Sequence, residues 1–210
     1  MIRVLLADDH SLVRKGLKHV LEEALDIRVE AEASDGLEAV EEHRRVHPDV
    51  AIVDIAMPKK DGFETAKLIL SDDPAARILI LTMYPEEQFA VRVLKAGALG
   101  YITKGSSTEE LHRAVRAVSR GKQYLSDLAE NAVSLHLLAN RIEQTPVGVL
   151  SNRELQVLCL IAQGCRLSKV ASQLGLSVKT IETYRSRVLQ KLCLHTDADI
   201  CRFAYDNKLV

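Results

Sequence analysis

Chemically reactive side chains follow four short apolar runs of this sequence, each at or just past the end of its run. They are Asp8 and Asp9 after IRVLLA (2–7), Asp54 after DVAIV (49–53), Thr82 after RILIL (77–81), and Lys104 two residues past LGYI (99–102). Continuous apolar runs of this length are typical of parallel strands buried on both faces. Because ligands of open parallel sheets bind beyond the carboxyl ends of the strands, we expect these side chains to meet on one small surface.

Three carboxylates held this close repel one another unless a cation or a proton lies between them. Carboxylate oxygens suit Mg²⁺, which binds a few of them and keeps several waters. An acid left partly free can attack phosphorus and form an aspartyl phosphate. A metal ion, the Thr82 hydroxyl and the Lys104 ammonium would then each neutralise one phosphoryl oxygen.

Taken singly, the same residues have ordinary explanations. Acids at a strand end are often helix N-caps, and a lone lysine such as Lys104 is usually a solvated surface charge. Asp54 is the hardest to explain in this way, because it follows an apolar run, precedes a Pro-Lys-Lys loop and caps no obvious helix.

Amphipathic segments of helical length alternate with the apolar runs, at 11–24, 36–46, 61–71, 86–96 and 108–119. With IRVEAEA (27–33) as the remaining strand, the pattern predicts a doubly wound (βα)5 parallel sheet over residues 1–120. Ser11 and Thr108 are predicted N-caps, and Pro85 suits a first helical turn.

The composition, with 47% hydrophobic and 27% charged residues in a chain of 210, is that of a globular protein with one or two domains. No apolar stretch approaches the ~20 residues that span a bilayer, and the start of the chain has the pattern of a strand rather than of a signal peptide. We therefore expect a soluble, cytoplasmic protein without a membrane partner. The four cysteines lack metal-ligand spacing and are expected to be reduced thiols.

The last 60 residues contain four short amphipathic segments, of which three open with Ser151, Ser177 or Thr196. Gly164 and Gly175 are placed to end the first two segments. A helix at 168–174, a turn and a helix at 178–192 predict a helix-turn-helix. Residues 151–210 hold 9 Lys and Arg against 5 Asp and Glu, which favours an anionic partner.

The predicted helix 178–192 carries cations beside polar side chains of mixed length, as contacts to base edges and phosphates require. The candidate DNA-binding residues are Lys179, Thr180, Glu182, Thr183, Arg185, Ser186, Arg187 and Lys191. A small helical bundle with a solvated basic face would show a similar pattern, so charge alone leaves both interpretations open.

Residues 121–147 are predicted to connect the two parts. Leu128, Ala132, Leu135, Leu138 and Ala139 recur at helical spacing, so part of this linker is expected to be a helix. TPVG (145–148) is typical of a flexible break.

The N-terminal part resembles the receiver domain of two-component response regulators in DDH (8–10), DIAMPKKDG (54–62), LT (81–82) and AGALGYITK (96–104). The C-terminal part resembles the LuxR-type helix-turn-helix of NarL/FixJ-type regulators. The matching residues are Leu150, Ser151, Arg153, Glu154, Val157, Leu158, Gly164, Val170, Ala171, Leu174, Ser177, Thr180, Ile181, Lys191, Leu192 and Ala204. The resemblance implies a receiver at 1–120, a linker at 121–147 and a DNA-binding domain at 148–210.

Within the receiver, the resemblance implies that Asp54 is the phosphoacceptor. It further implies a Mg²⁺ site made by Asp8, by Asp9 as a direct ligand, by Asp54 and by the Ala56 carbonyl. The expected phosphoryl contacts and switch residue are Thr82, Lys104 and Tyr101, the last being the aromatic that turns inward when Thr82 moves.

The expected partners are a sensor histidine kinase, double-stranded DNA, RNA polymerase and a second copy of the chain when active or bound to DNA. Three departures from the family pattern bear on DNA binding. Arg166-Leu167-Ser168-Lys169 stands where a Ser/Thr-Asn-Lys-Glu stretch is common. Cys193 stands where glycine is common, and Asp197 stands where arginine is common. Arg166 and Lys169 are candidates to replace the usual phosphate contacts near the second helix.

Two other functions compete with a phosphorylation-controlled regulator. An enzyme of the dinucleotide-binding class would need a GxG or Walker-type motif, which the sequence lacks, and a phosphatase of the aspartate class would need an acid where Ala56 stands. A regulator with a vestigial pocket would not need the complete set of acids, hydroxyl and lysine. We therefore expect a non-enzymatic regulator, with an Asp-dependent phosphotransferase as the weaker alternative.

Overall fold

The computed structural model describes residues 1–84, 86–126, 129–130 and 147–209, and the chain forms two compact units, 1–133 and 134–210. Pro85 and the five predicted linker-helix positions (Leu128, Ala132, Leu135, Leu138 and Ala139) lie outside the described residues, so these predictions stay predictions.

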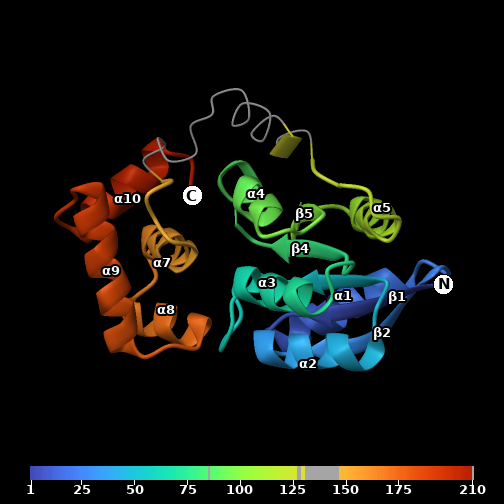
Figure 1. Cartoon of the computed structure of the whole chain (residues 1–210). Helices are drawn as coiled ribbons and strands as arrows, with labels where there is room; N and C mark the ends of the chain where they lie inside the picture. Colours follow the sequence, from blue (N-terminus) through green and yellow to red (C-terminus); the bar gives the residue numbers. More distant parts are fainter. Residues whose placement is uncertain (85, 127–128, 131–146, 210) are drawn as a thin grey trace. The chain divides into compact units, whose positions relative to one another are not determined.

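The N-terminal unit is a parallel sheet with helices on both faces (Figure 1). Its strands are β1 (Ile2–Ala7), β2 (Ile27–Ala33), β3 (Val50–Val53), β4 (Ile78–Thr82) and β5 (Gly100–Thr103), arranged in the order β2-β1-β3-β4-β5. Its helices are α1 (Ser11–Glu22), α2 (Gly36–Val46), α3 (Gly62–Asp72), α4 (Glu86–Lys95) and α5 (Thr108–Val118). The predicted doubly wound (βα)5 fold is confirmed, with strand ends shifted by one residue at β3, β4 and β5.

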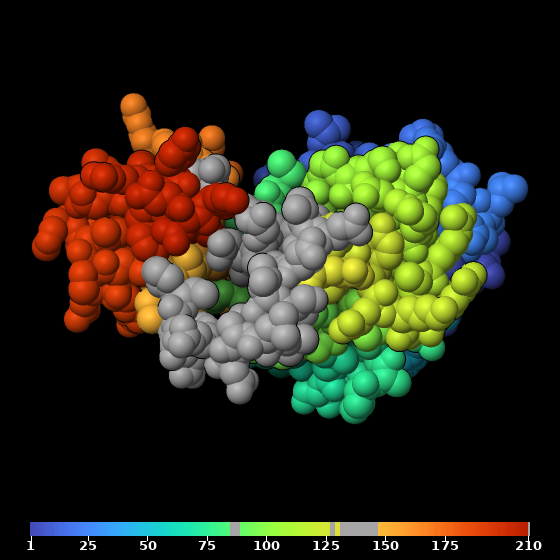
Figure 2. All heavy atoms as spheres, turned by 90° about the horizontal axis from the view of Figure 1, so that it is seen from above, coloured from blue at the N-terminus to red at the C-terminus, as the bar shows by residue number. Residues whose placement is uncertain are grey.

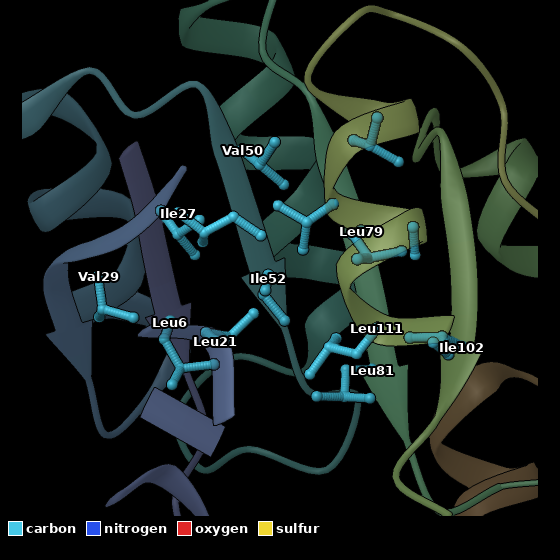
Figure 3. Packing of buried hydrophobic residues seen from close by; sticks show 14 of the residues in the cluster. Leu6, Leu21, Ile27, Val29, Val50, Ile52, Leu79, Leu81, Ile102 and Leu111 are labelled. Carbon is cyan, nitrogen blue, oxygen red and sulfur yellow. The ribbon is translucent and has the colours of Figure 1, made fainter. Parts of the chain in front are cut away.

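Helices α1 and α5 cover one face of this sheet. Leu21 of α1 and Leu111 of α5 pack with Leu6, Ile52 and Leu79 from three central strands (Figure 3). On the other face α2 packs against α3, and the Phe63 and Phe89 rings join α3 to α4 with their centroids 6.4 Å apart. Burial of both faces explains why the strands are apolar along their whole length.

The two edge strands of the sheet, β2 and β5, differ in what lies beside them. On β2 the exposed or half-buried positions are Arg28, Glu30 and Glu32, which alternate with buried apolar residues. Beside β5 the chain past α5 returns to the sheet, where Tyr101 N–H donates to the Tyr124 carbonyl and Tyr124 N–H donates to the Leu99 carbonyl. The first residues of the predicted linker therefore lie against the sheet.

Two N-cap predictions were wrong by one residue. Helix α1 begins at Ser11, so His10 holds the cap position without a side-chain cap bond, and its N–H donates to Asp8 Oδ1 instead. Helix α5 begins at Thr108, because Ser107 and Glu110 form a reciprocal capping box one residue earlier than predicted.

The C-terminal unit contains α7 (Asn152–Ala162), α8 (Leu167–Leu174), α9 (Val178–Leu192) and α10 (Asp197–Asp206). Helix α7 contacts the other three, and α8 and α9 form the predicted helix-turn-helix (Figure 1). The predicted N-caps Ser151, Ser177 and Thr196 each accept from a backbone N–H in the first turn of their helix. Figure 2 draws the heavy atoms of the chain as spheres, with those of this unit coloured orange to red. Among the described residues, no helix is long and apolar enough to cross a membrane.

Buried His43 on α2 should make folding sensitive to mild acid. Burial lowers the pKa of His43 below 6.5, and His47 adds to this effect while Asp73 and Asp72 oppose it. The unfolded chain therefore takes up the proton first, so stability falls as the pH drops below about 6.5. We expect the free energy of unfolding in urea to decline less in His43→Gln than in the wild type between about pH 7 and pH 5.5. Equal declines would contradict this assignment.

Cys193 ends α9 in the left-handed conformation, with φ 55° and ψ 39°. A side chain is strained there, so Cys193→Gly should stabilise the protein by about 1 kcal/mol. Cys193→Ala is the matched control, because it removes the thiol and keeps the Cβ, and it should give no such gain. Urea unfolding of both variants measures the difference; an equal gain in both would attribute the effect to the thiol.

Candidate functional site

Main-chain hydrogen bonds past the strand ends bring the predicted site residues together. Asp54 N–H donates to the Ala7 carbonyl, which places Asp54 beside Asp8 at the end of β1. Lys104 N–H donates to the Thr82 carbonyl, which pairs those two residues in the same way. The sheet thus continues its register for one residue beyond the strands and sets a hydroxyl, an ammonium and the carboxylates on one edge.

The Lys104 ammonium lies between two buried carboxylates. Its Nζ is 2.6 Å from Asp8 Oδ2 and 2.7 Å from Asp54 Oδ2. The two acids are 1% and 3% exposed, so water screens their mutual repulsion only weakly. One flexible cation therefore holds the two acids of neighbouring strands β1 and β3 in place.

Burial sets the electrostatics of the pocket. It raises the pKa of Asp54, a trend that the Asp8 charge reinforces and that Lys104 and the Ala56 N–H oppose. Burial also raises the pKa of Asp9, and the Asp54 and Asp8 charges add to this. For Lys104, burial alone would lower the pKa, but the attraction of Asp54 and Asp8 raises it. The raised pKa values thus disfavour the charged forms of Asp54 and Asp9, whereas the raised pKa of Lys104 favours its charged form.

The acid cluster has the composition of a divalent cation site. Ligand atoms of Asp8, Asp9, His10 and Asp54 all lie within 4.8 Å of one another. His10 Nδ1 is 2.7 Å from Asp9 Oδ1, a contact that the sequence did not predict. Oxygen donors at this spacing, with more negative than positive charge, fit a hard cation of the Mg²⁺ type.

Thr82 presents a buried hydroxyl without a partner. Its side chain is 1% exposed, and among the described residues its Oγ1 makes no hydrogen bond. A buried polar atom of this kind costs free energy unless a ligand satisfies it. Because Thr82 lies at the same sheet edge as the acids, its hydroxyl can donate a hydrogen bond to a group bound there.

Tyr101 is buried within the N-terminal unit. The ring is fully buried, and its hydroxyl donates to the Tyr84 carbonyl over 2.6 Å. Tyr84 follows Thr82 by two residues, so Tyr101 on β5 is connected to the chain segment that leaves β4.

The loop from β3 to α3 is fixed by a close approach and an ion pair. A Cβ at Gly62 would collide with the Asp54 carbonyl oxygen, so only glycine fits at the end of the loop that carries Ala56. Lys59, in a left-handed conformation with φ 61°, reaches Asp35 at the start of α2, with its Nζ 2.6 Å from Oδ2. The Lys59 side chain is therefore exposed but paired with Asp35.

Sequence reasoning also missed Arg14. Its Nη1 donates to the Asp8 carbonyl over 2.5 Å, and its Nε donates to Glu32 Oε2 over 3.2 Å. Arg14 thus ties the acid-bearing end of β1 to β2. Nothing in the sequence links residues 14 and 32, which lie on different elements 18 positions apart.

The predicted DNA-binding residues lie on α9, and most of them face solvent. Lys179, Glu182, Thr183, Ser186, Arg187 and Lys191 are exposed, whereas Thr180 and Arg185 are half-buried. Buried Ile181 and Val188 hold the opposite side of the helix against the unit. Arg166 and Lys169 at the start of α8 are also exposed.

Two of the four cations on α9 take part in ion pairs. Lys191 Nζ lies 2.7 Å from Oε2 of buried Glu154, and Arg185 Nε lies 2.5 Å from Oδ1 of Asp197. Glu154 is also the capping-box residue of α7, so Lys191 joins the end of α9 to the start of α7. The side chains of Lys179 and Arg187 make no ion pair within the part of the chain that the structure describes.

Residues 4–116 match the family of the response regulator receiver domain, and residues 148–204 match the luxR family of bacterial regulatory proteins. The response regulator UvrY of Escherichia coli K12 is 37% identical over 205 residues, which are 97% of this chain and 94% of UvrY.

Two solved structures of RcsB also resemble this chain. One, from Salmonella enterica serovar Typhimurium, is bound to promoter P1flhDC in the presence of the phosphomimetic BeF3⁻. It is 26% identical, covers 96% of this chain and 97% of RcsB, and has a TM-score of 0.64. The other holds two RcsB dimers bound to two parallel DNAs, is 26% identical, covers 97% and 98%, and has a TM-score of 0.59.

The two family matches fall on the two units, and together with the relatedness to UvrY they cover nearly the whole chain. The pocket at the sheet edge lies in the first match, and the helix-turn-helix lies in the second. The chain belongs to the two-component response regulators of the NarL/FixJ type, which join a receiver domain to a LuxR-type DNA-binding domain.

Proposed function

We propose that Asp54 accepts a phosphoryl group from a sensor histidine kinase and that this modification controls the binding of the α9 helix to specific DNA sites. The observation that carries the proposal is the pocket itself. A buried carboxylate at a strand end lies in hydrogen-bond contact with Lys104, on the same sheet edge as the unpartnered hydroxyl of Thr82. Asp-dependent phosphoryl transfer needs these three groups.

Transfer forms a bond between an Asp54 carboxylate oxygen and phosphorus and breaks the bond between phosphorus and the donor imidazole nitrogen. That nitrogen keeps the electron pair and is protonated. Lys104 is charged and next to Asp54, so it can follow the negative charge from the carboxylate to a phosphoryl oxygen. The Thr82 hydroxyl gains the acceptor that it lacks.

Asp8 and Asp9 would hold Mg²⁺, with Asp9 as a direct ligand and with Asp54 and the Ala56 carbonyl completing the protein's share of ligands. A bound Mg²⁺ supplies positive charge that offsets the crowded carboxylates and one phosphoryl oxygen. Burial raises the pKa values of Asp54 and Asp9, and a divalent cation beside them would favour their charged forms, which supports this assignment.

The DNA-binding surface would be the exposed side of α9. Lys179 and Arg187 would contact phosphates, and Glu182, Thr183 and Ser186 would face base edges. Thr180, Arg185 and Lys191 lie beside this face, where Arg185 and Lys191 are already paired with acids. Two copies of the chain would bind paired half-sites, and contact with RNA polymerase would couple binding to transcription in the cytoplasm.

In this proposal the receiver comprises residues 1–120, the linker 121–147 and the DNA-binding domain 148–210. Neither an Asp-dependent phosphotransferase nor a regulator with a vestigial pocket is favoured by a specific contact. Both make a different prediction from ours when Asp54 is replaced.

Asp54→Asn should abolish phosphorylation, because an amide cannot form the mixed anhydride with phosphate. The asparagine side chain has about the same size as the aspartate that it replaces. We expect the wild type to take up one phosphoryl group from acetyl phosphate with Mg²⁺, to lose this uptake with EDTA, and to change its DNA affinity on uptake. Asp54→Asn should show neither effect, and Asp73→Asn on the neighbouring helix end serves as the control. Intact-protein mass spectrometry measures the uptake. A phosphorylated residue other than Asp54 would disprove the assignment.

Thr82→Val should separate the role of the hydroxyl from its effect on stability. Since Oγ1 lacks a partner, its replacement by a methyl group should leave the unfolding temperature unchanged or slightly higher. The variant should nevertheless need about 10-fold more beryllofluoride for the same thermal stabilisation with Mg²⁺, because a hydrogen bond to a charged group is lost.

Thr65→Val is the matched control, since its Oγ1 is also buried without a hydrogen bond among the described residues but lies on α3. It should retain the wild-type beryllofluoride response. A wild-type response in Thr82→Val as well would remove Thr82 from the phosphoryl site.

A further inference from the structure

Asp197 is an acid of α10 that contacts the helix proposed to bind DNA. It is an exposed residue in the first turn of α10, where the helix dipole favours a carboxylate, and it lies close to the flank of α9. Its Oδ1 accepts a hydrogen bond from Arg185 Nε over 2.5 Å. The acid is therefore directed at a cation of the helix that is proposed to bind DNA.

Arg185 differs from its neighbour Arg187 in what surrounds it. The Arg185 side chain is 28% exposed and engaged by Asp197. Arg187 is exposed, and its charged group makes no ion pair within the described residues. Two arginines separated by one residue on the same helix are thus in different electrostatic states, one compensated by an acid and the other available to an external anion.

The ion pair between Arg185 and Asp197 is partly exposed to solvent. The Asp197 side chain is 49% exposed, so the ion pair is partly screened and worth little stability by itself. A DNA phosphate could replace the carboxylate as the partner of Arg185 only at the cost of breaking this contact. The pair therefore acts as a restraint on the arginine and contributes little to the fold.

We infer that Asp197 holds Arg185 against α10 and so withholds one cation of α9 from the DNA backbone, which limits sequence-independent affinity. The inference rests on the proposed DNA-binding function. Contacts to phosphates carry no sequence information and dominate non-specific binding. An acid that engages one cation of the helix thus lowers the sequence-independent part of the affinity without touching a base.

The test measures the salt dependence of binding to a duplex of mixed sequence, with the full chain and fluorescence anisotropy. Asp197→Asn should free Arg185 and make the slope of log K against log salt steeper by about one. Between about 0.05 and 0.2 M salt, the loss of affinity should then be about 3-fold larger than in the wild type. Asp197→Ser, which also lacks the charge, should give the same result.

Two further variants make the result specific to the pair. Arg185→Gln should leave the wild-type slope unchanged, and Arg185→Gln combined with Asp197→Asn should lose the gain. Asp206→Asn is the matched control, because it removes one acid from the other end of α10, where Asp206 faces Arg202 rather than α9. It should leave the slope at the wild-type value.

Three results would overturn the inference. A gain that persists in the double variant would mean that Asp197 acts by repelling phosphates directly. A slope reduced by about one in Arg185→Gln alone would mean that Arg185 already contacts DNA. An unchanged slope in both Asp197 variants, with wild-type DNA binding intact, would show that no cation is withheld. A wild type that fails to bind DNA under any condition would instead reject the proposed function.

Discussion

The contact of one lysine with two buried acids is the constraint on which the pocket depends. Asp8 and Asp54 follow adjacent strands, so the register of the sheet forces them together whatever their charge. Lys104 arrives from β5 and compensates both at 2.6 and 2.7 Å. Removal of either partner of a buried ion pair leaves an uncompensated charge, which is strongly destabilising. The pocket is therefore stable only while some cation occupies its centre.

This constraint links the pocket to distant parts of the same unit. Lys104 contacts Asp54 and follows β5, the strand that carries Tyr101, whereas Thr82 ends β4, the strand that leads to Tyr84. Tyr101 is bonded on one side to the segment after β4 and on the other to Tyr124, past α5. The ring hydroxyl and the backbone N–H of this one residue thus contact both chain segments.

The sequence allowed the pocket to be predicted because its members follow from one rule, that parallel strands share an edge for their carboxyl ends. The same rule could not reveal Arg14, whose partners depend on side-chain reach across elements. The N-caps of α1 and α5 were misplaced because adjacent residues, His10 and Ser11 or Ser107 and Thr108, differ only in local geometry. On α9, periodicity identified the helix, but charge counting could not tell which cations were already paired.

The finished edges of the sheet have a consequence for how copies of this chain can associate. An open strand edge is a template on which a foreign strand can grow, and charged side chains or local pairing suppress this. Here β2 carries Arg28, Glu30 and Glu32, and the main chain at Tyr124 occupies hydrogen-bonding groups beside β5. Strand addition is therefore disfavoured at both sides. Self-association is thereby left to helical surfaces, where side chains rather than backbone amides decide the partner.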